Sequence, residues 1–257
     1  MPAVPRFHCA EPLHVGASIS LPPGAARHVQ VLRLQPGDTI TLFGGAVCDA
    51  PVAPHRMAGG GEFEALITTI GRNTVQAVIQ RHDPVARESP CVVHLAIGMP
   101  ANERMDWLVE KATELGVASI QPLMSERSVV RLKGERAQKK AAHWRSIAVA
   151  ACEQCGRNYV PTVQTAQALP AWIRQFGSAG ANPGTRLVLS LHLDAPRLRQ
   201  AMGPDSARTM TLLAGPEGGL SAAEEALAMR HGFAPVSLGP RVLRSETAAL
   251  VALTLLA

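Results

Sequence analysis

Residues 212–221 of the chain read Leu-Leu-Ala-Gly-Pro-Glu-Gly-Gly-Leu-Ser, a strand, a turn and the start of a helix in immediate succession. The apolar run that ends at Ala214 is typical of a buried strand, and the Gly-Pro pair after it breaks that strand. Ser221 and Glu224 have the spacing of a capping box, which predicts that a helix begins there. This succession is the repeating unit of an α/β fold with a mostly parallel sheet.

The turn inside this stretch favours a ligand held by backbone atoms. Gly218 and Gly219 can adopt conformations closed to other residues and let a ligand approach the main chain. A Gly-rich turn between strand and helix often binds phosphate, but Glu217 would repel one, and neither a P-loop nor a G-x-G-x-x-G motif is present. The chemistry better fits a ligand that is neutral or cationic at this point, such as the sulfonium of S-adenosylmethionine. A tight strand–helix connection without a ligand explains this segment equally well.

A second segment repeats the design. Residues 237–248 read Ser-Leu-Gly-Pro-Arg-Val-Leu-Arg-Ser-Glu-Thr-Ala, so a strand ends at a Gly-Pro turn, and Ser245 is expected to cap a final helix over residues 246–256. Acids favour the first turn of a helix, which explains Glu246 without any function, whereas cations are disfavoured there. Arg241 and Arg244 therefore indicate an anionic substrate beside this turn.

These two segments carry a family resemblance. The chain resembles the bacterial 16S ribosomal RNA uridine-N3 methyltransferases, the ribosomal RNA small subunit methyltransferase E family of the SPOUT superfamily. The matching segments are residues 6–7, 28–33, 103–105, 111–117, 125–127, 150–158, 213–221 and 238–247. The resemblance thus covers nearly the whole chain. The two C-terminal segments are highly specific, and the N-terminal match is looser.

The composition is that of a globular protein with a surplus of basic residues. Of 257 residues, 47% are hydrophobic and 18% are charged, and the net charge of +5 favours an anionic partner. Basic residues gather between Arg127 and Arg145, where RNA contact and a solvated helix face are both reasonable explanations. No apolar run is long enough to span a membrane, and no secretory signal is evident. The scattered set of five cysteines makes the cytoplasm the expected compartment.

The cysteines indicate structural thiols rather than a metal centre. Five scattered cysteines do not describe a disulfide framework. Cys152 and Cys155 form a lone C-x-x-C inside a helical pattern, and no second pair stands at zinc spacing. We therefore expect buried thiols and no bound metal.

The chain is expected to contain two domains. Residues 1–83 read as short strands separated by turns, which suggests a small β-barrel. Residues 84–90 are polar and hold two prolines, and we place a linker there. Over residues 91–257 strands alternate with helices, which predicts a mostly parallel sheet with helices on both faces. The family pattern is interrupted at residues 46–61, an enlarged hairpin loop to which no function is assigned.

The resemblance implies finer features. The first domain would be a PUA-like RNA-binding barrel, and the second a SPOUT methyltransferase domain whose C-terminal helix threads a trefoil knot. Physics alone would not favour a knot. The cofactor, S-adenosyl-L-methionine, would lie bent in that knot at the interface of a homodimer. The partner implied is 16S rRNA, within the 30S subunit, with no membrane and no DNA.

The resemblance also assigns site residues. The residues expected to hold the cofactor are Leu191, Leu213, Gly215, Glu217, Gly218, Gly219, Leu238, Gly239 and Leu243. The residues expected to contact RNA are Arg6, Arg27, Arg33, Arg104, Arg127 and Arg157. For each of these arginines the alternative is a solubilising surface position or a salt bridge inside the fold.

The expected reaction is methyl transfer from S-adenosylmethionine to N3 of a uridine. N3 carries a proton and lies on the pairing edge, so the proton must leave and the base must be unpaired or flipped. We expect Arg244 to stabilise the negative charge that develops on the uracil, and Glu246 to be the base. Two alternatives stay open. One is a SPOUT ribose 2′-O-methyltransferase, whose Asn/Arg motif the segment Asn102-Glu103-Arg104 resembles, and the other is a non-catalytic RNA-binding assembly factor.

Overall fold

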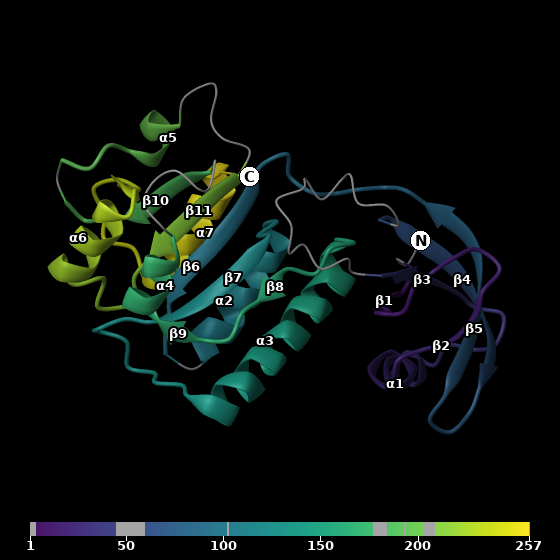
Figure 1. Cartoon of the computed structure of the whole chain (residues 1–257). Coiled ribbons are helices and arrows are strands. Elements are labelled where there is room, and N and C mark those ends of the chain that lie inside the picture. The colour runs from purple at the N-terminus through teal and green to yellow at the C-terminus, as the bar shows by residue number, and fades with distance from the viewer. Residues whose placement is uncertain are drawn as a thin grey trace. The chain divides into compact units, whose positions relative to one another are not determined.

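The chain forms two compact units, which the computed structural model in Figure 1 presents together. The structure describes residues 4–44, 60–101, 103–176, 184–192, 194–202 and 209–256. As far as these residues are described, unit 1 comprises Met1–Glu88 and Val149–Val160, and unit 2 comprises Ser89–Ala148 and Pro161–Ala257. The hairpin loop expected at residues 46–61 lies outside the described residues except for its last two positions.

Unit 1 is built on a sheet with the strand order β1-β3-β4-β5-β2. The strands are β1 (Arg6–His8), β2 (Ser18–Ser20), β3 (Thr39–Phe43), β4 (Glu62–Ile70) and β5 (Val75–Asp83), and helix α1 spans Pro23–Val31. β1 pairs with β3 in parallel, and the other pairs are antiparallel. The short strands expected from the sequence are present, and the closure of this sheet into a PUA-like barrel stays a prediction.

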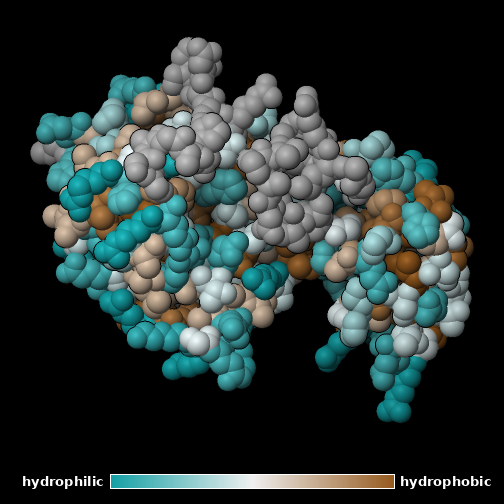
Figure 2. All heavy atoms as spheres, viewed as in Figure 1, coloured by the Kyte–Doolittle hydropathy of each residue, from teal (hydrophilic) through white to brown (hydrophobic). Residues whose placement is uncertain are grey.

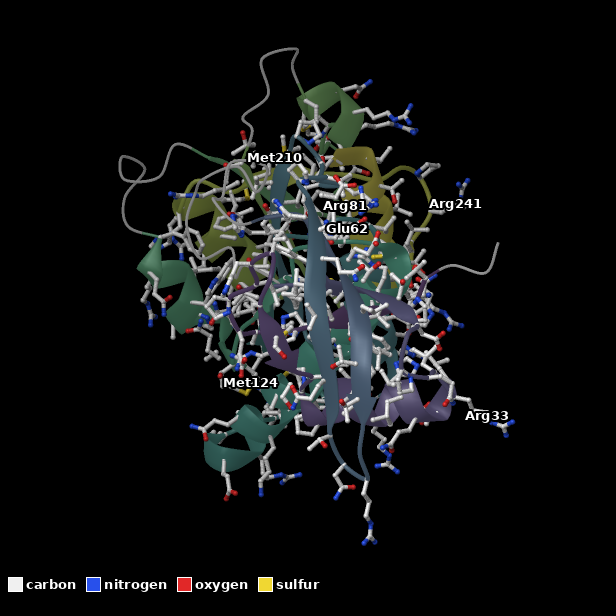
Figure 3. All side chains as sticks on the ribbon, turned by 90° about the vertical axis from the view of Figure 1, so that its right-hand side faces the viewer. Arg33, Glu62, Arg81, Met124, Met210 and Arg241 are labelled. Carbon is white, nitrogen blue, oxygen red and sulfur yellow. The ribbon has the colours of Figure 1, made fainter. Side chains whose placement is uncertain are left out.

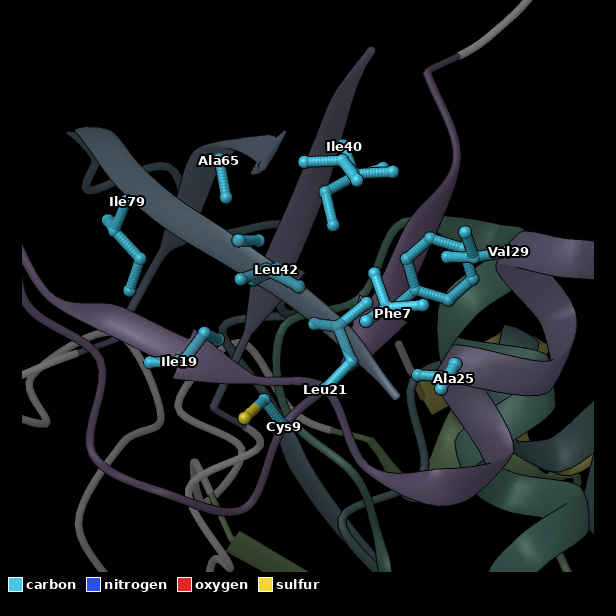
Figure 4. Packing of buried hydrophobic residues seen from close by; sticks show 14 of the residues in the cluster. Phe7, Cys9, Ile19, Leu21, Ala25, Val29, Ile40, Leu42, Ala65 and Ile79 are labelled. Carbon is cyan, nitrogen blue, oxygen red and sulfur yellow. The ribbon is translucent and has the colours of Figure 1, made fainter. Parts of the chain in front are cut away.

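The core of unit 1 lies between one face of this sheet and α1. Along β4 the side chains of Phe63, Ala65 and Ile67 are buried, whereas the side chains between them are only partly buried. This alternation is expected of a strand with one face toward a core. Figure 4 shows Phe7 of β1 beside Val29 of α1 within the same cluster. The period-two pattern in the sequence therefore determines which face of the sheet packs against α1.

The second segment of unit 1 is the end of helix α3 (Gly134–Cys155) and the loop that follows it. The His8 backbone N–H donates to Glu153 Oε1 at 3.0 Å, and Arg6 Nη2 donates to Asn158 Oδ1 at 2.7 Å. These bonds tie residues 149–160 to β1. The sequence-based limits left this segment in the second domain, and those limits stay a prediction.

Unit 2 is built on a parallel sheet. Its strands are β6 (Val92–Gly98), β7 (Ser119–Met124), β8 (Thr162–Val163), β9 (Gln167–Ala168), β10 (Thr185–Leu189), β11 (Thr209–Ala214) and β12 (Ala234–Val236). The strand order is β12-β10-β11-β6-β7-β8, and β9 pairs with the far end of β7. Every pair in register is parallel. The mostly parallel sheet expected from the sequence is confirmed.

Helices pack against both faces of this sheet (Figure 1). Helices α4 (Leu169–Gln175) and α6 (Ala222–Arg230) pack together over Ala96 and Leu213. Because neighbouring residues of a strand point to opposite faces, Leu95 and Leu212 belong to the other face. Helix α7 (Ser245–Leu256) lies against β6 and β11 and packs with α2 (Glu103–Glu114), and the short helix α5 (Leu198–Ala201) also contacts α7.

Local sequence signals determine where these helices end. Glycines at positions 116, 156 and 232 follow α2, α3 and α6, with φ angles of +87°, +87° and +82°. This left-handed conformation is the usual helix C-terminal cap, and glycine adopts it without a steric penalty. The three glycines therefore determine where these helices end.

The surface over unit 2 is mainly hydrophilic on the side that Figure 2 shows, with smaller apolar areas between the charged residues. Two large apolar side chains, Leu191 and Val242, are 71% and 77% exposed. Both lie in loops that follow strands of the parallel sheet. Among the described residues no helix combines the length and apolar character needed to cross a membrane.

Candidate functional site

A pocket opens where three adjacent strands of unit 2 end. Strands β12, β10 and β11 are neighbours and parallel, so their carboxyl ends meet at one edge of the sheet, the usual place for a ligand in such folds. The loops that follow them enclose a cavity of about 180 Å³. It is lined by Arg127, Leu189, Ser190, Leu191, Ala214, Gly215, Pro216, Glu217, Gly218, Gly219, Leu220, Glu225, Val236, Ser237, Leu238, Gly239, Arg241, Val242, Leu243, Ser245 and Ala248.

The loop after β11 is compact because it lacks side chains at critical points. A Cβ on Gly215 would lie 2.8 Å from the Gly219 carbonyl carbon, and Gly219 itself has a φ of +69°. The Gly219 N–H donates to the Pro216 carbonyl at 2.8 Å. Ser221 and Glu224 then form the expected capping box, each side chain accepting a hydrogen bond from the other residue's N–H. The glycines are thus required by the turn itself.

Arg127 holds this loop from outside. Its Nη1 donates to the Gly218 carbonyl at 2.8 Å, and a Cβ on Gly218 would lie 3.2 Å from Arg127 Cβ. The aliphatic part of the arginine therefore packs on the glycine, and its guanidinium binds the loop's backbone. Arg127, expected from the sequence to contact RNA, therefore lines the pocket and stabilises this loop.

The loop after β12 is the second wall. Gly239 has a φ of +127°, and its N–H donates to Ser237 Oγ at 3.2 Å. Beyond this turn the chain exposes Arg241 and Val242, and Figure 3 shows the Arg241 side chain extended away from the ribbon. The two glycine turns expected from the sequence therefore face the same cavity.

An arginine joins the two walls. Glu217 Oε1 accepts a hydrogen bond from the Ala101 N–H at 2.9 Å and lies 3.4 Å from Arg104 Nη1. Arg104 Nε in turn lies 4.0 Å from Glu246 Oε1, and the other oxygen of that carboxylate accepts from Ser245 Oγ at 3.1 Å. Glu246 is buried, with its side chain 8% exposed. Arg104 therefore bridges the loop after β11 and the start of α7.

Of the nine residues expected to hold the cofactor, eight line the pocket. The exception is Leu213, whose side chain is fully buried in the cluster that α4 and α6 cover. Its neighbour Ala214 lines the pocket instead, because successive residues of β11 point to opposite faces. Sequence reasoning also missed Ser190, Leu220 and Glu225. Ser190 directly follows β10, and its place at the end of a predicted strand is the signal that could have identified it.

The two expected catalytic residues lie beside the pocket and not in its lining. The Arg244 side chain is exposed and makes no hydrogen bond or ion pair with any described residue. Its carbonyl accepts the Ala248 N–H at 2.8 Å, so α7 begins at Ser245, one residue earlier than expected. The expectation that Ser245 caps this helix is wrong, because Ser245 is itself the first helical residue, and its hydroxyl donates to Glu246.

The six arginines expected to contact RNA fall into three groups. Arg104 and Arg127 hold the pocket's loops, as described above. Arg27 and Arg33 are exposed on unit 1, and Figure 3 shows Arg33 extended away from the ribbon. The other two lie inside unit 1. Arg6 donates to Asn158 and pairs with Glu62, and the buried Arg157 donates through Nε to Glu88 Oε1 at 2.9 Å.

The cysteine pair occupies the end of α3. Burial raises the pKa of the Cys152 thiol to about 12, and Cys152 Sγ donates to the Tyr159 carbonyl at 3.4 Å. A thiol with so high a pKa is protonated and unreactive at neutral pH. Within the described ranges, no group of three or more histidine, cysteine, aspartate or glutamate side chains could hold a metal ion.

Comparison with known proteins identifies relatives along the whole chain. Residues 87–257 match the family model described as an RNA methyltransferase domain. Ribosomal RNA small subunit methyltransferase E of Buchnera aphidicola (Schizaphis graminum) is 30% identical over 98% of this chain and 95% of its own length. The enzyme of that name from Synechocystis is 33% identical over 93% of this chain and 72% of its own length.

Two solved structures resemble this one over nearly their full lengths. Ribosomal RNA small subunit methyltransferase E from Neisseria gonorrhoeae, bound to S-adenosylmethionine, has a TM-score of 0.84 and 35% identity, with 98% of this chain and 95% of that chain covered. A protein from Legionella pneumophila in complex with S-adenosylmethionine has a TM-score of 0.85 and 36% identity, with 99% and 97% covered.

Proposed function

The chain belongs to the family of RNA methyltransferases named ribosomal RNA small subunit methyltransferase E, and we propose that it methylates N3 of a uridine in 16S rRNA with S-adenosylmethionine as methyl donor. The observation that carries the proposal is the pocket of glycine turns after β11 and β12. Relatives that share this fold over nearly the full chain were crystallised with S-adenosylmethionine.

The residues of the pocket fit this cofactor. Leu189, Leu238 and Leu243 supply apolar surface for a purine, and the backbone of the two turns supplies hydrogen-bonding groups. Glu217 and Glu225 place carboxylates in the lining, which suit a cationic or hydrogen-bond-donating ligand and would repel phosphate. Bound here, S-adenosylmethionine supplies an electrophilic methyl group on a sulfonium.

The chain's own residues would then prepare the uridine. N3 becomes a nucleophile as it loses its proton, and negative charge spreads onto the uracil oxygens. Arg244 directly precedes α7, and its exposed guanidinium is free to stabilise that charge. Glu246, buried and bridged to Arg104, is the carboxylate nearest in sequence and our candidate for accepting the proton.

We also propose the finer features that family membership implies. These are a PUA-like RNA-binding barrel in residues 1–83, a linker at residues 84–90, a trefoil knot in the domain of residues 91–257, a homodimer, the 30S subunit as substrate and a cytoplasmic location. Leu191 and Val242 line the pocket and are largely exposed, which supports the homodimer, because apolar side chains at a site's rim favour cover by a second surface.

The alternative of ribose 2′-O-methylation rests on residues 102–104, and Asn102 lies outside the described residues. The proposal is tested with unmodified 30S subunits and free 16S rRNA, labelled S-adenosylmethionine and mass spectrometry of the nucleosides. N3-methyluridine is the expected product. A ribose-methylated nucleoside, or cofactor binding without transfer to either substrate, would overturn the proposal.

The role of Arg244 is tested in the same assay. Arg244→Ala is expected to lower the single-turnover rate by about 10²-fold, the typical loss when one charge-stabilising group is removed. Its affinity for S-adenosylmethionine should not change, because the side chain lies outside the pocket lining. Arg230→Ala, at the exposed end of α6, is the matched control and should leave both unchanged. A normal rate for Arg244→Ala would show that the proposed role is wrong.

A further inference from the structure

Glu225 is a pocket residue to which neither the resemblance nor the proposed mechanism assigns a specific contact. It lies in the first turn of α6, where an acid is favoured by the helix dipole alone. That explanation accounts for an acid that points to solvent. The Glu225 side chain is instead only 13% exposed and lines the same cavity as Gly215 and Gly239. The sequence pattern gives no reason for this burial.

One oxygen of this carboxylate has a partner and the other has none. Oε2 lies 3.6 Å from His192 Nε2, whose side chain is 72% exposed. Oε1 is buried, and no donor among the described residues reaches it. A buried acceptor without a hydrogen bond costs free energy, and in native proteins such an atom calls for a specific explanation. Because Glu225 lines the cavity, a ligand seated there is the candidate donor.

The neighbouring acids show how the fold treats carboxylates that serve structure. Glu224 accepts hydrogen bonds on both oxygens, from the N–H groups of Ser221 and Glu126. Glu217 accepts from the Ala101 N–H and pairs with Arg104. Of the described carboxylates in the pocket lining, Glu225 is the one with a buried oxygen that no protein donor reaches. Its partner is expected to be a ligand N–H or O–H group.

The character of the pocket favours the adenosine part of the cofactor as that ligand. Leu220 and Leu238 belong to an apolar lining that suits a purine, and a single acceptor beside it would fix the purine's orientation. Adenosine carries two kinds of donor, the exocyclic amine and the ribose hydroxyls. The carboxylate of the methionine part would be repelled by Glu225.

We propose that Glu225 is a cofactor-binding residue whose Oε1 accepts a hydrogen bond from the adenosine part of S-adenosylmethionine. This inference rests on the proposed function for the identity of the cofactor. It assigns affinity and orientation to a side chain, in a pocket whose walls are two glycine turns and several leucines. His192, at the solvent side of the same carboxylate, lies 3.6 Å from the other oxygen.

The test is calorimetric binding to the full chain, which requires no catalysis. The probes are S-adenosylmethionine and 5′-methylthioadenosine, which keeps adenine and ribose but lacks the amino-acid part. Glu225→Gln should weaken both by at least about tenfold, since a charged acceptor of a buried hydrogen bond is lost. Glu135→Gln, which removes the same charge from an exposed side chain on α3, should bind like wild type.

A third probe identifies the donor. 5′-Methylthioinosine carries an oxygen where 5′-methylthioadenosine carries the exocyclic amine. Wild type should prefer the adenosine compound strongly, because two acceptors would otherwise face each other. The side-chain amide in the Glu225→Gln variant can donate to that oxygen, so a smaller preference in the variant assigns the bond to the amine. An unchanged preference, with both compounds weakened, assigns it to a ribose hydroxyl.

The failures are separable. Weaker binding of S-adenosylmethionine with unchanged binding of 5′-methylthioadenosine would show that Glu225 accepts from the methionine ammonium. That result would overturn the proposal. Unchanged binding of both probes by Glu225→Gln would overturn it as well, while the proposed function stands. A wild-type chain that binds no S-adenosylmethionine would remove both. Without ligand, the melting temperatures of Glu225→Gln and Glu225→Ala should be no lower than that of wild type. A purely structural role of Glu225 would lower the melting temperature of both variants.

Discussion

At the residue scale, Arg104 carries the contact that joins the two halves of the site. It pairs with Glu217 in one loop and approaches the buried Glu246 at the start of α7. An isolated buried carboxylate is costly, so the guanidinium both orients Glu246 and offsets its desolvation. Local sequence signals did not reveal this pairing. Positions 104, 217 and 246 lie far apart in the sequence, and only the folded sheet brings them together.

Arg104→Ala is expected to affect catalysis more than cofactor binding. Loss of the bridge releases Glu246, and a small displacement of a reacting group can cost about 10²-fold in rate. Binding of S-adenosylmethionine should weaken by less, because the Ala101 N–H still holds Glu217. Single-turnover rates at saturating cofactor and calorimetric binding would separate the two effects. Arg174→Ala on the exposed side of α4 is the control, and a rate restored fully by excess cofactor would contradict the argument.

Glu62 shows the same principle in unit 1, where it accepts hydrogen bonds from Arg6 and Arg87. Burial alone would raise the pKa of this carboxyl, but the two arginines outweigh burial and hold the pKa below its usual value of 4.5. Glu62→Gln should lower the free energy of unfolding at neutral pH by roughly 1–3 kcal/mol, because Arg6 is left largely buried without its counter-charge.

The sign of the pH dependence follows from the lowered pKa. The stabilising contribution of Glu62 is complete above pH 4.5 and disappears as the pH falls through the lower pKa of the folded state. The gap between wild type and Glu62→Gln should therefore close in acid. Denaturant unfolding at several pH values measures it. Glu64→Gln, in an exposed pair with Arg81, should change stability by at most about 0.5 kcal/mol, and a Glu62 gap that widened in acid would refute the assignment.

At the element scale, the unit that matters is a strand followed by a glycine turn and a helix. The turn at Gly215 can be tested directly, since an added Cβ would lie 2.8 Å from backbone atoms of residues 219 and 220. The backbone cannot move aside as a flexible side chain can, so Gly215→Ala should distort the loop. The affinity for S-adenosylmethionine should fall by at least about tenfold.

The control for this substitution is Gly24→Ala. Gly24 lies in α1, its Cβ would meet nothing within 4 Å, and its φ is not positive. The change should be neutral or stabilise the protein by up to about 1 kcal/mol, because alanine favours a helix. Binding of S-adenosylmethionine by isothermal calorimetry compares the two variants. Wild-type affinity in Gly215→Ala would mean that the loop tolerates a side chain.

Prediction from sequence succeeded where the signal was local. The capping box at Ser221 and the glycine caps act within a few residues, so their patterns read directly as helix ends. It failed by one residue at Ser245, whose hydroxyl binds Glu246 in place of the helix backbone. It also missed Gly98, where a Cβ would collide with Pro216, since that close approach exists only after β6 and β11 pair.

At the scale of the whole molecule, the sequence predicted the parallel sheet of unit 2 but not which residues make up each unit. The parallel sheet of unit 2 follows from alternating strands and helices, and its pocket from the edge at which parallel strands end. The inclusion of residues 149–160 in unit 1 could not be predicted. It depends on hydrogen bonds between β1 and the end of α3, which have no pattern along the chain.

The inclusion of residues 149–160 in unit 1 changes the role expected of Arg157. The sequence could assign it to RNA or to an internal salt bridge, and the structure buries it, 5% exposed, with both Nε and Nη2 donating to Glu88. Arg157→Ala should therefore lower the free energy of unfolding by roughly 3–5 kcal/mol, because Glu88 is left buried and unpaired. The folded fraction should bind 16S rRNA with unchanged affinity.

Arg27, exposed on α1, should behave in the opposite way. Arg27→Ala is expected to change stability by at most about 0.5 kcal/mol, while weakening rRNA binding and flattening its salt dependence by about one phosphate contact. Urea unfolding and filter binding at several salt concentrations measure both variants. If Arg157→Ala kept full stability and lost rRNA affinity, the buried pair with Glu88 would not explain that residue. Crossed effects in the two variants would separate the arginines that build unit 1 from those that can reach an anionic partner.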